Sequence, residues 1–207
     1  LVVARITYPE PQNLEPTLKA IEIGALRPIF WLYLAAAACI AVGFTDYSLV
    51  AFHIKKAEVL RDKWIPLIYA GAMGVDALSA LLVGYLYDRK GLPVLLTVVV
   101  VSAWSAPLVF LSGSGGLIGG MALWGIGMGA QESIIRAIVA NLVPTDRRAT
   151  GYGVFNAGFG LAWFVGSAVM GILYDRSLIV LAVFSVAAQL TSLPLLYSFQ
   201  KRLISDL

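Results

Sequence analysis

The stretch that decides the fold is a hexapeptide that occurs twice, first as Gly84-Tyr85-Leu86-Tyr87-Asp88-Arg89 and again as Gly171-Ile172-Leu173-Tyr174-Asp175-Arg176. Each copy closes a long apolar segment, and three such segments separate the two copies. An odd number of membrane crossings between equivalent positions places those positions on opposite sides of a bilayer. The repeat therefore predicts two structural units of inverted topology.

The composition independently indicates a membrane protein. Of the 207 residues, 59% are hydrophobic and 13% are charged, and the mean hydropathy is +0.84. Soluble domains carry roughly 25% charged residues, and a water-soluble fold could not bury this much apolar surface. We expect about six spans of some 20 residues each. An even number of spans puts both chain ends on one side.

The expected spans are apolar runs separated by short charged or turn-forming segments. They extend from Pro28 to Phe52, Trp64 to Tyr87, Pro93 to Leu111, Gly116 to Leu142, Thr150 to Tyr174 and Leu178 to Tyr197. Prolines in residues 1–24 break any long helix there. The sequence thus predicts a cytoplasmic linker at 1–24 and a six-helix transmembrane domain at 25–207.

The distribution of Lys and Arg predicts the orientation in the membrane. Basic residues near the spans are concentrated on the side of the termini, where they are Arg5, Lys19, Arg27, Arg89, Lys90, Arg147, Arg148, Lys201 and Arg202. The opposite side has Lys55, Lys56, Arg61, Lys63 and Arg176. The positive-inside rule places both termini in the cytoplasm. We expect an integral protein of a bacterial or archaeal plasma membrane, and the net charge of +3 requires no nucleic-acid partner.

Four ionisable residues fall within the expected spans, where a charge is costly. At a rise of 1.5 Å per residue, Asp76 and Glu132 lie about 15 Å from the cytoplasmic ends, near the midplane, and Arg136 about 9 Å in. Asp46 falls in the outer third. Glu132 and Arg136 are four residues apart and are able to pair on one helix face. A structural role and a role in a substrate or ion pathway both stay open for the four residues.

Several site types receive no support from the sequence. Cys39 is the single cysteine, which excludes an internal disulfide and a multi-cysteine metal site. No phosphate-binding Gly-rich loop with a Lys and no metal-ligand spacing of His, Asp or Glu is present. We therefore expect no nucleotide-driven pump, enzyme, cofactor or metal centre. His53, beside Lys55 and Lys56, is expected to be solvated.

The segment from Gly84 to Gly91 resembles the signature loop of the major facilitator superfamily, Gly-x-Leu-x-Asp-Arg-x-Gly, which follows the second helix of each six-helix half. Further residues resemble the family's fourth helix, basic cytoplasmic loop and fifth helix: Arg136, Ala137, Asn141, Pro144, Arg147, Arg148 and Gly151. Residues 25–31 resemble the start of its seventh helix. The resemblance covers residues 24–207 and implies an all-α membrane fold, two inverted three-helix repeats that form a carboxyl-terminal half. The chain departs from the pattern after Gly91, where Leu92-Pro93 replaces further basic residues.

The resemblance also implies roles for the signature loop. Gly84, Asp88, Arg89 and Gly91 match its conserved pattern positions, with Asp88 expected to cap a helix of the other half. Arg89 would join a charge network that holds the outward-facing state together. Two further basic residues, Arg147 and Arg148, are alternative members of this network within the chain.

The leading functional hypothesis is one half of a secondary active transporter that moves a small solute by alternating access, coupled to protons or another ion. Its partners would be membrane lipid, the solute, and either a missing amino-terminal six-helix half or a second copy of itself. The alternative is a non-transporting membrane sensor or scaffold with the same fold. Neutral replacement of Asp76 and Glu132 distinguishes the two, because a scaffold tolerates it.

Overall fold

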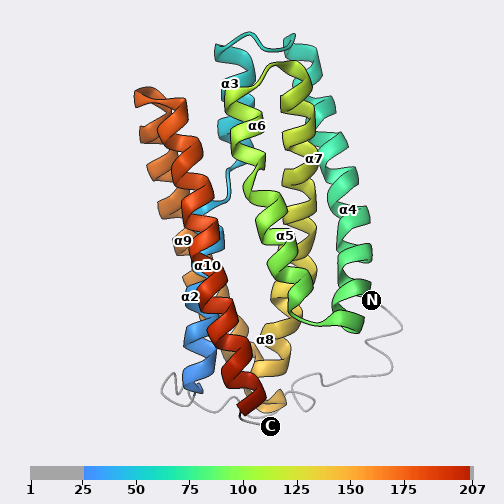
Figure 1. Cartoon of the computed structure of the whole chain (residues 1–207), viewed down its shortest axis with the longest axis vertical. Helices are drawn as coiled ribbons and strands as arrows, with labels where there is room; N and C mark the ends of the chain where they lie inside the picture. Colours follow the sequence, from blue (N-terminus) through green and yellow to red (C-terminus); the bar gives the residue numbers. More distant parts are fainter. Residues whose placement is uncertain (1–25, 206–207) are drawn as a thin grey trace, which may run out of the picture.

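The computed structural model describes residues 26–205 and places most of them in helices along the longest axis of the molecule (Figure 1). Within these residues there is no strand. The elements are α2 (Pro28–Gly43), α3 (Tyr47–Lys56), η3 (Asp62–Trp64), α4 (Ile65–Lys90), α5 (Pro93–Ala103), α6 (Ser105–Leu111), α7 (Ser114–Ala130), η4 (Gln131–Ile135), α8 (Arg136–Leu142), η5 (Thr145–Arg147), α9 (Arg148–Arg176) and α10 (Leu178–Ser205). The linker expected at 1–24 lies outside the described residues.

Five helical runs are long and apolar enough to cross a membrane. They are Pro28–Lys56, Asp62–Lys90, Pro93–Leu111, Thr145–Arg176 and Leu178–Leu203. The sixth expected span is the run of α7, η4 and α8, which is rich in glycine and contains the charged residues Glu132 and Arg136. Figure 1 shows this run extending beside α4 along the bundle. The predicted all-α membrane fold is confirmed, with the expected span boundaries shifted by a few residues.

The connections between spans alternate between the two ends of the bundle. The α4–α5 and α8–α9 connections lie at the end that also holds the start of α2 and the end of α10, here called the first end (Figure 1). The α3–α4, α6–α7 and α9–α10 connections lie at the opposite, second end. Since the two hexapeptides close α4 and α9, they lie at opposite ends of the molecule. The inverted repeat is confirmed.

Three of the expected spans are interrupted. The first breaks after Gly43, where Phe44 takes an extended backbone with ψ 121° before α3 begins at Tyr47. The third bends at Trp104, between α5 and α6. The fourth contains a π-helical turn at η4, a local feature that often occurs at functional sites. Hydrophobicity alone gave no sign of these interruptions.

Glycines allow α7 to pack directly on the backbone of α4. A Cβ atom at Gly125 would lie 2.6 Å from the Ala72 carbonyl oxygen, and one at Gly129 would lie 2.6 Å from that of Asp76. Such small residues four apart let two helix backbones approach closely within a membrane. The close contact fixes which residues of α4 face α7, and Asp76 is among them.

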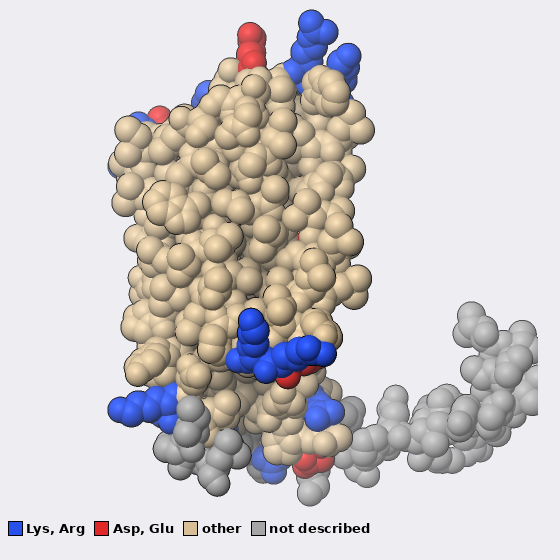
Figure 2. Space-filling view, turned by 45° about the vertical axis from the view of Figure 1, so that its right-hand side comes forward, with Lys and Arg blue, Asp and Glu red and all other residues tan. Residues whose placement is uncertain are grey.

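Charged residues are segregated as a membrane environment requires. Figure 2 shows that Lys, Arg, Asp and Glu gather near the two ends of one face, and that the broad band between them carries none. Large apolar side chains are highly exposed there and elsewhere along the spans, for example Leu81 at 74% and Phe164 at 70%. In water this surface would aggregate, whereas lipid or another membrane helix accommodates it.

Candidate substrate and ion pathway

Asp76 lies in the contact between α4 and α7. Its side chain is buried, with 8% of the residue exposed, and its Oδ1 atom has no hydrogen-bond partner. The nearby Ser79 hydroxyl donates instead to the Ile126 carbonyl oxygen, at 3.1 Å. Glu132 follows Gly129 by about one turn, in η4, which also packs against α4. The two acidic residues that the sequence placed near the midplane thus lie on directly packed helical runs.

Glu132 and Arg136 are both exposed but are not paired. Glu132 lies in the π turn and Arg136 begins α8, and no ion pair joins them in residues 26–205. A π turn adds one residue to the helical repeat, so side chains four apart no longer stack. The pairing expected from their spacing is therefore not formed. The turn is held by the Tyr33 hydroxyl, which donates to the Ile135 carbonyl oxygen at 3.1 Å.

The exposed Glu132 and Arg136 lie between the two least buried spans. The α7 run packs against α4, and α8 packs against α9 and α2. In the most apolar windows of the spans that contain α4 and α9, only 22% and 17% of residues are buried. Two opposite charges, with open helices on either side, form what we call the charged face. Lipid is an unfavourable neighbour for such a face, because an unpaired charge in hydrocarbon costs at least about 2.5 kcal/mol.

Asp46 lies at a break in the first span rather than within a continuous helix. It follows the break in the first span, where its carboxylate accepts a hydrogen bond from the Ser48 backbone N–H at 3.1 Å and caps α3. The residue is half-buried. This capping bond gives Asp46 a structural role, whereas nothing tests its expected role in the pathway. This cap could have been predicted from the run Gly43-Phe44-Thr45-Asp46, since Asp is strongly preferred as a helix N-cap.

Polar side chains from other spans satisfy the exposed backbone at this break. The Gly43 carbonyl oxygen accepts hydrogen bonds from the Ser185 hydroxyl at 2.6 Å and the Gln189 amide at 3.1 Å, both on α10. The Trp124 indole N–H donates to the Thr45 carbonyl oxygen at 2.7 Å. Unpaired backbone groups are costly in a bilayer. Gln189 therefore holds α10 against the break in the first span.

The first hexapeptide, in the signature loop, has few partners. Gly91 ends α4 with a φ of 71°, a left-handed conformation that glycine adopts without strain. Asp88 and Arg89 are exposed, and within residues 26–205 neither forms an ion pair. The Arg89 guanidinium instead lies 4.4 Å from the centroid of the Tyr85 ring. Asp88 therefore keeps its acceptor oxygens available for a group outside the described residues.

The basic loop after α8 does not neutralise Asp88. Arg147 contacts its neighbour Asp146, with 3.7 Å between Nε and Oδ2, and both side chains are exposed. No ion pair between Asp88 and Arg147 or Arg148 occurs in the described part of the chain. The structure thus gives no support to an internal charge network of these residues.

The second hexapeptide is bonded within the chain. The Tyr174 hydroxyl and His53 Nδ1 lie 3.0 Å apart in a hydrogen bond, and Lys56 Nζ lies 3.2 Å from Asp175 Oδ1. The same ammonium group is 5.1 Å from the centroid of the Tyr174 ring. His53 is 3% exposed, so the expectation of a solvated histidine is wrong. The α3 helix turns its ring inward against α9.

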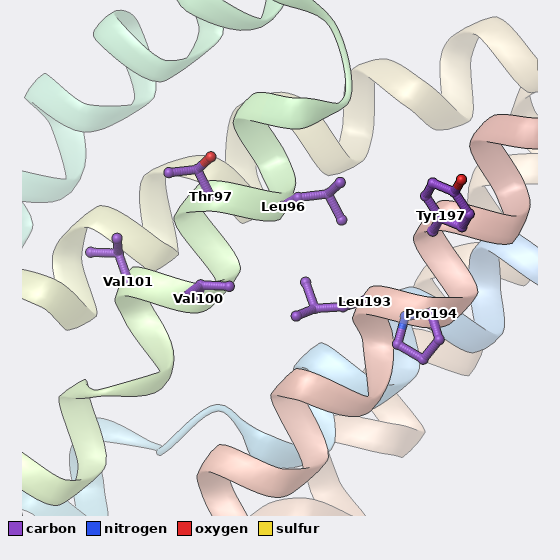
Figure 3. A pocket seen from close by; sticks show the side chains of 7 residues that line it. All are labelled: Leu96, Thr97, Val100, Val101, Leu193, Pro194 and Tyr197. Carbon is purple, nitrogen blue, oxygen red and sulfur yellow. The ribbon is translucent and has the colours of Figure 1, made fainter.

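An apolar groove lies between α5 and α10. It has a volume of about 600 Å³ and is lined by Leu96, Thr97, Val100, Val101, Leu193, Pro194 and Tyr197. Figure 3 shows Leu96 and Leu193 directed into the gap from the two helices. The Thr97 hydroxyl is engaged with the Pro93 carbonyl oxygen at 2.9 Å. This lining offers little to a polar solute and suits a lipid tail.

Comparison with known proteins agrees with the geometry. The family model described as Major Facilitator Superfamily matches residues 2–167 and 39–202. Similar proteins include uncharacterized proteins of Mycobacterium bovis and of two strains of Mycobacterium tuberculosis, each 38% identical over 176 residues. The match covers 85% of this chain and 43% of each relative, so the chain spans less than half the length of these relatives. This chain belongs to the major facilitator superfamily, whose members are membrane transporters.

Proposed function

We propose that this chain forms the carboxyl-terminal half of a secondary active transporter, which moves a small solute by alternating access at the expense of an ion gradient. The observation that carries the proposal is the charged face, where Glu132 and Arg136 are exposed within a membrane span and are not paired with each other. Ionisable residues within membrane spans almost always face the interior of a helix bundle or a water-filled cavity. The missing wall of the pathway is a second six-helix unit.

The open helices on either side of the charged face support this partner. Between the ends of α4 and α9 the exposed surface is mostly apolar. Among the described residues, no other helix lies within 4 Å of the position that a Cβ atom would occupy at Gly71, Gly74 or Gly160. Small residues on open faces favour close packing with further helices. The partner half, or a second copy of this chain, would cover these helices and leave the charged face as an internal cavity.

The orientation forms part of the proposal. The first end, with Asp88, Arg89, Arg147 and Arg148, is assigned to the cytoplasm, and the second end, with Asp175 and Arg176, to the outside of a plasma membrane. In this arrangement Asp88 would bind a helix of the partner half in the outward-facing state. A carboxylate at a helix amino terminus is stabilising by about 0.3 to 1 kcal/mol.

Alternating access can be tested before the solute is known. Ser133→Cys is introduced beside Glu132 in the full-length protein that contains this chain, in a Cys39→Ala background, and probed with a membrane-impermeant maleimide. The proposal expects labelling from outside in one population and from inside in another. Labelling from a single side under all conditions, or from neither side, would favour the sensor or scaffold hypothesis. Arg176→Cys, labelled from outside only, controls for leaky membranes.

A further inference from the structure

The apolar groove between α5 and α10 is suited to one class of lipid. We propose that it binds an acyl chain of an anionic phospholipid, whose phosphate lies at the first end against Lys201 and Lys90. The groove is formed by α5 and α10, whereas the charged face lies between α4 and α9. A partner half that covers the charged face therefore leaves the groove in contact with the bilayer. The inference goes beyond transport and does not depend on it.

The walls of the groove match an acyl chain in chemistry. Apart from Thr97 and Tyr197 the lining is aliphatic, and the Thr97 hydroxyl already donates to the Pro93 carbonyl oxygen. Figure 3 shows side chains of both helices directed into the gap. Pro194 lies within α10, and a proline inside a helix bends it, which is a physical reason for a gap at this level. The volume of about 600 Å³ suits a small ligand.

The length of the groove matches one leaflet of a bilayer. The α5 helix begins at the first end and α10 ends there (Figure 1). From Pro93 to Val101, the last lining residue of α5, the helix rises about 12 Å, and from Leu193 to Lys201 α10 rises the same distance. Half of the hydrocarbon core is about 15 Å thick. The groove thus extends from the first end to near the midplane, as an acyl chain does.

The charges at the mouth of the groove suit an anionic headgroup. Lys201 follows Tyr197 by one turn on the same face of α10, and Lys90 precedes α5 by three residues. Both lysines are exposed, and neither forms an ion pair within residues 26–205. The helices α5, α6 and α10 contain no acidic residue, and Asp88 is the nearest one along α4. Basic residues at this level attract anionic lipids.

Tyr197 joins the two parts of the site. It lines the groove and lies one turn from Lys201, with 66% of the residue exposed. Its hydroxyl forms no hydrogen bond within the described part of the chain. A tyrosine at the edge of the hydrocarbon layer places its ring among acyl chains and its hydroxyl among headgroups. The side chain therefore supplies a donor where the acyl chain meets the glycerol and phosphate.

A photoreactive lipid tests the site. The full-length protein that contains this chain is reconstituted in phosphatidylcholine vesicles with a trace of phosphatidylglycerol that carries a diazirine on one acyl chain. After illumination, mass spectrometry of peptides locates the adducts. We expect them on residues 93–101 and 193–197, well above those on residues 179–183 of α10, whose side chains are also exposed. Phosphatidylcholine with the same photoreactive chain should give far fewer adducts in the groove.

Two pairs of variants separate the headgroup from the acyl chain. Lys201→Gln should lower the adducts from phosphatidylglycerol about fivefold, whereas Lys63→Gln, the matched loss of charge at the second end, should leave them unchanged. Leu193→Trp fills the groove and should remove the adducts on its walls. Val183→Trp adds the same side chain at an exposed position of α10 and should retain them.

Equal labelling by the two lipids would overturn the proposal, because the groove would then accept any acyl chain whatever its headgroup. Adducts that survive Leu193→Trp would place the lipid elsewhere. Absence of adducts in the groove would show that another protein helix covers it. If Leu193→Trp fails to fold, the surface change Lys201→Gln decides the question. Alternating access is judged separately by the labelling of Ser133→Cys, so either proposal can fail without the other.

Discussion

The two copies of the repeated hexapeptide differ in what they contact. At the second end, Tyr174 bonds to His53 and Asp175 pairs with Lys56, so this copy ties α9 to α3. At the first end, Asp88 has no ion-pair partner within residues 26–205, and Arg89 lies against the ring of Tyr85. Nearly identical sequences thus serve internal stability in one repeat and leave charges available in the other. In the proposed transporter, the difference indicates that the first end is the one that would bind the partner half.

The largest expected effect concerns the side of the membrane that each copy faces. Single cysteines at Arg89 and Arg176, introduced in a Cys39→Ala background, should react with an impermeant maleimide from opposite sides, in an all-or-none manner. The reason is the inverted repeat, which places the two loops at opposite ends of the bundle (Figure 1). Intact cells and inside-out vesicles provide the measurement. Labelling of both positions from the same side would show that the two copies of the hexapeptide do not face opposite sides of the membrane.

The internal bonding of the second copy predicts unequal effects on stability. Tyr174→Phe leaves the buried His53 Nδ1 without its partner and should lower the free energy of unfolding by about 1 to 3 kcal/mol. Tyr87→Phe is the matched change in the first copy, where the hydroxyl forms no hydrogen bond with residues 26–205, and should cost less than about 0.5 kcal/mol. Unfolding in mixed micelles measures both. Equal losses would show that the two copies are bonded alike.

The available charge of the first copy predicts an effect on conformation. Asp88→Asn in the full-length protein should lower the outward-facing population two- to fivefold, which corresponds to about 0.3 to 1 kcal/mol for a carboxylate at a helix amino terminus. Distances between spin labels at the first end report the population. Asp175→Asn is the matched control and should leave the distances unchanged. A larger response to Asp175→Asn would reverse the roles assigned to the two copies.

The smallest effect is expected from the exposed ion pair of the second copy. Lys56→Met removes the pair with Asp175, whose side chain is 72% exposed, and should cost no more than about 1 kcal/mol of stability. The loss should shrink as salt is added, because exposed charges are screened. Lys55→Met controls for the removed charge, because Lys55 forms no ion pair in the described part of the chain. A salt-independent loss would indicate that packing of Lys56 on the Phe52 and Tyr174 rings is the main contribution.

Periodic and repeated features of the sequence predicted the fold well. Apolar runs located the spans, and the hexapeptide gave their inverted arrangement, since both depend on properties that each segment carries by itself. The breaks at Gly43 and in η4 were missed. They depend on donors from distant helices, namely Ser185 and Gln189 for Gly43 and Tyr33 for Ile135. Sequence spacing does not reveal which distant side chain satisfies which carbonyl.

The candidate site was predictable in composition but not in geometry. Charges in an apolar span are rare enough to identify Asp76, Glu132 and Arg136 from the sequence. Which of these side chains lie close to one another depends on how the helices pack. Gly125 and Gly129 bring Asp76 against α7, and the π turn separates Glu132 from Arg136. The burial of His53 was missed for a similar reason, because its partner Tyr174 is 121 residues away.

The broken first span has a consequence for biosynthesis. The Gly43 carbonyl receives its hydrogen bonds from side chains 142 and 146 residues later in the chain. At about 5 to 20 residues per second, the ribosome needs roughly 7 to 28 s to reach Ser185 after Gly43 has been made. During that interval the nascent first helix either stays in the translocon or has its Gly43 carbonyl oxygen hydrogen-bonded to water. The α10 helix therefore completes the hydrogen bonding of the first span, which stays incomplete until α10 has been made.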